Sequence, residues 1–163
     1  MSRRLTLRRE DDQKFVLGGM DEFLTGLLRE IPGAGVPEGE ARERFFPKPT
    51  AGTHPEADGE WAEFVQPELE EQFLERRDCV AEDLRGLKDA GRRGWELVIP
   101  RKHLGAWIHA LNQARIALSC RNRLGERELD EDVNLLGPEG VLVFQVRFYG
   151  LLQEWMLSVT DEL

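Results

Sequence analysis

Four stretches of the chain repeat apolar residues at the spacing of an α-helix, and this feature restricts the fold more than any other. They cover about residues 21–31, 67–90, 101–124 and 141–159. Residues three and four positions apart share one face of a helix, so each stretch carries an apolar stripe that has to pack against another element. With 163 residues, the chain is long enough to enclose one independent core. We therefore expect a single domain over residues 1–163, mostly α, built as a compact bundle of four main helices.

Short runs of β-forming residues predict a small antiparallel sheet beside the bundle. Residues 5–7 and 15–17 are separated by a polar stretch, which is typical of a β-hairpin. The glycines at 18–19 are expected to end the second strand. Residues 95–99 (WELVI) alternate and are rich in β-formers, and we expect them to add a third strand, because a lone hairpin is only marginally stable.

The region between the first two helices is rich in residues that interrupt regular structure. Residues 32–60 hold five of the eight prolines, and Pro32 is expected to end the first helix. Residues 38–46 favour one or two helical turns, and 47–60 is expected to be a loop. Phe45 and Phe46 are adjacent aromatic residues, which we expect to anchor this loop to the core.

The balance of charge argues against general nucleic-acid binding. The net charge is −9, and an acidic surface repels phosphate backbones. The basic residues nevertheless gather locally, and DNA binding stays open if the fold collects them on one face. These clusters are Arg3, Arg4, Arg8 and Arg9; Arg92, Arg93, Arg101 and Lys102; and Arg121 and Arg123.

The sequence predicts a cytoplasmic protein that does not bind a membrane. Its first residues contain no apolar signal region. The longest apolar run, 141–146, is far shorter than the roughly 20 residues of a membrane helix. Cys79 and Cys120 lie far apart without a CxxC spacing, which suits a reducing compartment.

No motif for a catalytic, metal or cofactor centre is recognisable. His103 and His109 lie six positions apart on the third helix, about 120° from sharing a face, whereas helical zinc sites use histidines four apart. His54 lies in the loop. The serines have no GxSxG context, and no phosphate-binding glycine motif occurs. We therefore expect no enzymatic activity, no metal and no cofactor.

Cys120 is the one candidate for thiol chemistry. Arg121 follows it, and Arg115 and Arg123 are near in sequence. Positive neighbours lower the pKa of a thiol, which would make Cys120 a redox-active residue. A cysteine inside a helix beside small residues is more often a buried structural residue, and both interpretations stay open.

Polar residues on the third helix form the most informative constellation. Asn112 and Arg115 lie one helical turn apart beside an apolar stripe. Burying either side chain without a partner costs several kcal/mol, so each is expected to bind another helix or a carboxylate. With Trp107 and Arg121, this pair either fixes the packing of the helices or lines a ligand site.

Taken together, these residues resemble the bacterial family catalogued as domain of unknown function 2017 (DUF2017). The resemblance rests on Trp107, Ala110-Leu111-Asn112, Arg115, Leu118, Arg121 and Leu124-Gly125, with Arg44-Phe45-Phe46-Pro47, the opening hairpin, and Tyr149, Leu152, Gln153 and Trp155 in the final helix. Where family members continue the arginine with leucine and then a leucine-glycine pair, this chain has Ile116 and then Leu118-Ser119.

The resemblance implies a non-enzymatic protein. Members often lie beside genes for an adaptor of ATP-dependent proteolysis, and a stress-related or transcriptional regulatory role is suggested for them. The apolar final helix leads us to expect a regulatory or protein-interaction domain that binds a protein partner or forms a homodimer through residues 141–163. The alternatives are a DNA-associated transcriptional regulator and a small-ligand binder around Asn112 and Arg115.

Overall fold

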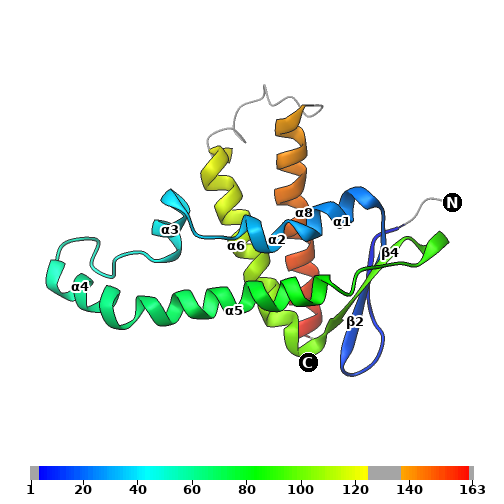
Figure 1. The fold of residues 1–163 in the computed structure, drawn as a ribbon, viewed down its shortest axis with the longest axis horizontal. Coiled ribbons are helices and arrows are strands. Elements are labelled where there is room, and N and C mark those ends of the chain that lie inside the picture. The colour runs from blue at the N-terminus through cyan, green and yellow to red at the C-terminus, as the bar shows by residue number, and fades with distance from the viewer. Residues whose placement is uncertain (1–3, 125–136, 162–163) are drawn as a thin grey trace.

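Two long helices, α6 (Leu104–Asn122) and α8 (Pro138–Asp161), lie side by side and form the centre of the molecule (Figure 1). The computed structural model describes residues 4–124 and 137–161. A third long helix, α5 (Gln66–Leu84), crosses α6. A small sheet lies beyond the C-terminal end of α5 (Figure 1). The fold is mostly α with a small antiparallel sheet, as the sequence predicts.

The sheet contains strands β1 (Thr6–Arg9), β2 (Lys14–Met20), β3 (Lys88–Asp89) and β4 (Trp95–Pro100) in the order β1-β2-β4-β3. All neighbouring strands are antiparallel. The predicted third strand is confirmed, since Leu17 lies opposite Leu97 in the ladder between β2 and β4. The two-residue strand β3 extends the sheet at the far edge of β4.

The prediction that the glycines at 18–19 end the second strand was wrong, because β2 continues to Met20. The pairing of β2 with β4 shifts between Leu17 and Met20, so the glycines occupy an irregularity inside the strand. Gly19 has φ +76°, and a Cβ there would lie 1.9 Å from the carbonyl oxygen of Arg4. Glycine is required here for its positive φ and for the close approach of the neighbouring backbone.

Prolines begin helices at two places where the sequence predicts loop. Pro32 lies in the first turn of the short helix α2 (Ile31–Ala34), which follows α1 (Glu22–Arg29) after Glu30. Pro55 begins α4 (Pro55–Phe64), within the stretch predicted to be irregular. A first-turn residue needs no hydrogen bond from its own N–H, so proline is tolerated there.

The aromatic pair Phe45 and Phe46 fastens the end of α3 (Gly39–Phe45) to α5. Their rings lie 5.7 and 5.1 Å from the ring of Phe73. The two residues therefore anchor this segment, as predicted, although they do so on α5 and outside the central core. In Figure 1, α3 and α4 lie towards the far end of α5, away from the sheet.

The central core joins the sheet to the helices. Its fully buried large side chains are Leu17, Met20, Leu28, Ile31, Leu97, Ile99, Leu104, Trp107, Leu111, Leu124, Tyr149 and Leu152.

The ends of the last two long helices differ slightly from the prediction. A 3-10 turn, Arg101–His103, precedes α6, which is followed by Arg123 in the left-handed conformation, and α8 begins at Pro138. The predicted stop at Gly125 lies outside the described residues.

Candidate functional site

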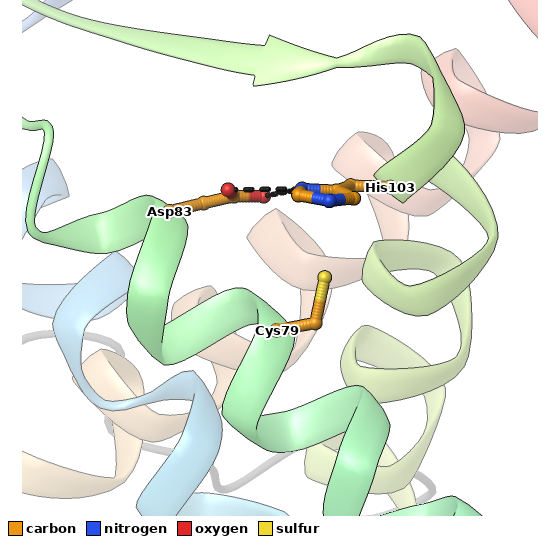
Figure 2. Close-up of side chains that lie close together, drawn as sticks. All are labelled: Cys79, Asp83 and His103. Atoms are coloured by element: carbon orange, nitrogen blue, oxygen red, sulfur yellow. Dashed lines mark hydrogen bonds and ion pairs between the residues drawn. The ribbon is translucent and has the colours of Figure 1, made fainter.

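Three side chains of different chemistry meet where α5 crosses the start of α6. Cys79 and Asp83 lie four residues apart on α5, so they project from the same face of that helix. His103 ends the 3-10 turn before α6. Figure 2 shows the thiol and the imidazole pointing into the space between the two helices, with the carboxylate beside the imidazole.

The carboxylate of Asp83 is the centre of this cluster. Nδ1 of His103 lies 3.0 and 2.9 Å from its two oxygens. The indole Nε1 of Trp107 donates to Oδ2 of Asp83 at 2.9 Å. The side chain of Asp83 is 8% exposed and that of His103 is 27% exposed, so the cluster lies at the edge of the protein, where solvent reaches one side of it.

The surroundings of Cys79 raise the pKa of its thiol. Burial raises the pKa of Cys79, and the negative charge of Asp83 raises it further, against an opposing effect of Lys102. A cysteine nucleophile needs the reverse, a thiolate stabilised by positive neighbours. Cysteine, histidine and aspartate therefore meet here around a thiol whose pKa is raised, and the arrangement suits hydrogen bonding or metal coordination.

Sequence reasoning missed this cluster. The interpretation of the histidines compared His103 only with His109, on the same helix, and no common face was found. The available signal was the spacing of Cys79 and Asp83 on one helix face. The third member lies 20 residues beyond Asp83, and only the crossing of α5 and α6 brings it to them.

The predicted constellation on α6 is formed in part. Trp107 is fully buried and binds Asp83. Arg115 is partly buried, and its Nη1 donates to Oε1 of Gln153 on α8 at 2.9 Å, so it has the partner on another helix that we expected. The prediction of a buried amide at Asn112 was wrong, because Asn112 is exposed and the next residue, Gln113, is 3% exposed.

The two predicted polar residues consequently do not share a pocket. Arg115 lines a hollow beside α8 together with Gly150 and Gln153, and its guanidinium packs on Gly150. Asn112 is not among the residues that line this hollow. A one-position error on a helix turns a side chain by about 100°, which is enough to exchange a buried position for an exposed one.

Arg121 and Cys120 lie near the other end of α6. Nη2 of Arg121 donates to the carbonyl oxygen of Ala34 at 2.6 Å, which ties α6 to α2. Cys120 is partly exposed, and Nη1 of Arg44 lies 3.5 Å from its sulfur. The contact of Cys120 with a positive charge therefore comes from α3, 76 residues away in sequence.

A comparison with known families matches the model of the domain of unknown function DUF2017 over residues 4–163, essentially the whole chain. The chain belongs to the DUF2017 family. No curated protein and no solved structure is similar enough to match this DUF2017 chain. The family description assigns no activity.

The outer face of α8 presents large apolar side chains to solvent in the DUF2017 protein. Phe144 and Leu151, seven residues apart on this helix, are 45% and 38% exposed. The opposite face of α8, which includes Tyr149 and Leu152, is buried against the rest of the core. On α1, the half-exposed ring of Phe23 lies 5.7 Å from the ring of Phe144 and widens the apolar surface.

Among the described residues of the DUF2017 chain, the arginines do not all lie on one face. Arg4 and Arg8 meet Arg92 and Arg93 around a shallow hollow at the edge of the sheet, whereas Arg121 lies near the far end of α6, where it donates to the carbonyl oxygen of Ala34. The hollow is lined by Arg4, Thr6, Arg8, Gly18, Gly19, Arg92, Arg93 and Glu96. Within residues 4–124 and 137–161, no helix has the length and hydropathy needed to cross a membrane.

Proposed function

We propose that this DUF2017 chain is a non-catalytic, regulatory protein-interaction domain of the bacterial cytoplasm that forms a homodimer through α8. The observation that carries the proposal is the half-exposed apolar face of α8, centred on Phe144 and Leu151. Large apolar side chains surrounded by charged residues are typical of protein–protein contacts. The proposed partner is a second copy of the same chain.

The charges beside this face complement one another in an antiparallel dimer. Arg147 and Glu154 are exposed, lie seven residues apart, and border the same edge of the stripe formed by Phe144 and Leu151. When two α8 helices pack antiparallel about a midpoint near residues 150–151, Arg147 of each copy lies opposite Glu154 of the other. A two-fold axis forms both ion pairs at once, as flanking charges do in coiled coils.

Neither charge is already used within the described part of the chain. No ion pair joins Arg147 or Glu154 to another residue in 4–124 or 137–161, and both line the hollow beside α8. In a parallel dimer, Arg147 would lie beside Arg147 of the other copy and Glu154 beside Glu154, and these like charges would repel. The pattern therefore favours one orientation, and that selectivity is what distinguishes an interface from an incidental apolar surface.

The two cysteines support the cytoplasmic location and the non-catalytic role that we propose. Both cysteines are free, in keeping with a reducing compartment. Burial and the charge of Asp83 raise the pKa of the Cys79 thiol, which disfavours nucleophilic catalysis. Regulation through binding is the role that remains most consistent with these properties.

Charge reversal tests the dimer and its orientation together. Arg147→Glu and Glu154→Arg are each expected to weaken dimerisation by about 10–30-fold, because two symmetry-related pairs change from attraction to repulsion at about 0.5 kcal/mol for each effect. The double variant exchanges the charges and should restore the dimer. Sedimentation equilibrium across the micromolar range measures the three dissociation constants against the wild type.

Arg85→Glu is the matched control, since Arg85 is a highly exposed arginine at the end of α5 and its reversal should leave the dimer unchanged. Phe144→Asp should give a monomer. A wild-type protein that stays monomeric at tens of micromolar refutes the proposal. A dimer that survives both single reversals refutes the antiparallel arrangement.

A second candidate function is DNA binding through the arginines around the sheet-edge hollow. Arg4, Arg8, Arg92 and Arg93 converge there, although Arg93 also lies 3.7 Å from Glu96. If this surface binds DNA, replacing both Arg92 and Arg93 by Glu should weaken binding and reduce its salt dependence. Gel shifts at low salt decide the question, because a wild-type protein that binds no duplex there has no such function.

A further inference from the structure

The geometry points to a binding site for a divalent transition-metal ion, with Zn²⁺ as the best fit, formed by the Cys79 sulfur, an Asp83 oxygen and a ring nitrogen of His103. All three donor atoms lie within 4.8 Å of one another. Two of them come from one face of α5 and the third from the start of α6 (Figure 2). The site is independent of the surface on α8.

The distances between the donors are close to those that the ion needs. Zinc bonds to sulfur, nitrogen and oxygen are about 2.0–2.3 Å long, which places tetrahedral donor atoms roughly 3.4–3.6 Å apart. The donor atoms are at most 4.8 Å apart. Each donor–donor distance therefore has to shorten by no more than about 1.4 Å. Side-chain rotation supplies such a movement. His103 and Asp83, now 2.9 Å apart, have to separate slightly so that the ion replaces their hydrogen bond.

The surroundings of the carboxylate resemble the outer shell of a metal site. Trp107 donates its indole N–H to Oδ2 of Asp83 at 2.9 Å, which fixes the carboxylate and leaves Oδ1 to face the ion. Hydrogen bonds of this kind orient the ligands of metal centres and tune their affinity. Because Trp107 is fully buried, the orientation of the carboxylate is set by the packing of α6.

The donor set selects the class of ion. Mg²⁺ and Ca²⁺ prefer shells made of oxygen, whereas one thiolate, one imidazole and one carboxylate suit Zn²⁺ and its spectroscopic substitute Co²⁺. Cys79 and His103 are partly exposed, so the ion has a route in from solvent and water can complete its fourth position. Coordination would link α5 to α6 and would stabilise the crossing of these helices.

Binding should release the proton of Cys79. The pKa of this thiol is raised by burial and by the charge of Asp83, and the ion coordinates only the thiolate. Affinity is therefore expected to rise with pH across the neutral range. Calorimetry of Zn²⁺ binding in buffers of different ionisation enthalpy counts the released protons.

Cobalt titration of the full chain, freed of metal with a chelator, tests the site. A thiolate-to-cobalt charge-transfer band is expected in the near ultraviolet, and Zn²⁺ should abolish it by displacement. The chain has two cysteines, so the single variants assign the sulfur. Cys79→Ser should remove the band, and Cys120→Ser should keep it.

Three further variants test the histidine ligand and the outer hydrogen bond. His103→Gln should weaken Zn²⁺ binding at least tenfold, whereas His109→Gln, in the following helix α6, should not. Trp107→Phe, which removes the outer hydrogen bond and leaves all three ligands in place, is expected to weaken binding by about 10–100-fold. Circular dichroism checks that each variant is folded. If a variant is unfolded, the cobalt band of the wild type and of Cys120→Ser decides the result. A wild-type protein without the band, or a band that depends on Cys120, overturns the inference.

Discussion

The hydrogen bond from Trp107 to Asp83 should be among the strongest single contacts between α5 and α6. It joins a fully buried indole to a nearly buried carboxylate at 2.9 Å. Hydrogen bonds to charged groups contribute about 1.5–3 kcal/mol to stability. Trp107→Phe also removes part of the buried ring, at about 1 kcal/mol more. We therefore expect this variant to lower the free energy of unfolding by about 2.5–4 kcal/mol.

A double-mutant cycle isolates the hydrogen bond from the loss of packing. Trp107→Phe and Asp83→Ala, alone and combined, should show a coupling energy of about 1.5–3 kcal/mol, because either change removes the same contact. Urea unfolding followed by far-ultraviolet circular dichroism, with a chelator present, measures the four stabilities. This readout avoids the indole fluorescence that the variant alters.

Glu82 provides the control for this cycle. It precedes Asp83 in α5, its side chain is 70% exposed, and its ion pair is with Arg85 at 3.2 Å. Glu82→Ala should show almost no coupling to Trp107→Phe, since the two residues share no partner. A coupling below about 0.5 kcal/mol for the Asp83 cycle would show that the hydrogen bond is not the source of the effect.

Three further predictions concern other parts of the fold. Tyr149→Phe removes a buried hydroxyl that donates to the carbonyl oxygen of Leu27, and urea unfolding should show a loss of about 1–3 kcal/mol. Hydrogen bonds from the backbone of Thr50 and from its hydroxyl hold the pKa of Asp58 below its ordinary value. Asp58 therefore stabilises the fold above its ordinary pKa and loses this effect as the pH falls through the lowered value, so the stability difference between the wild type and Asp58→Asn should shrink in acid. Gly19→Ala should destabilise the sheet by more than about 1 kcal/mol in thermal unfolding, whereas Gly26→Ala, in helix α1 with open space around it, should be neutral or stabilising. An equal effect of the two alanine substitutions would contradict the argument for Gly19.

Several elements could be predicted because their causes are local. The apolar repeat along α6 and the alternation of WELVI depend on neighbouring residues, and each element was found at its expected place. Errors occurred where a distant backbone decided the structure. The glycine at 19 continues a strand because the chain at Arg4 lies against it, and nothing in the adjacent residues reports that contact.

The candidate sites show the same division. The sequence by itself determined that α8 is apolar on more than one side, since that property belongs to the order of its residues. Only the tertiary structure decided which side is buried, because α6 covers one face and leaves Phe144 and Leu151 exposed.

The cluster of Cys79, Asp83 and His103 depends on tertiary structure more strongly still. Spacing along one helix can place two of its members on a common face, as the helical repeat requires. The third member is brought there by the crossing of α5 and α6, and that crossing is set by the packing of side chains such as Trp107, which come from across the whole core.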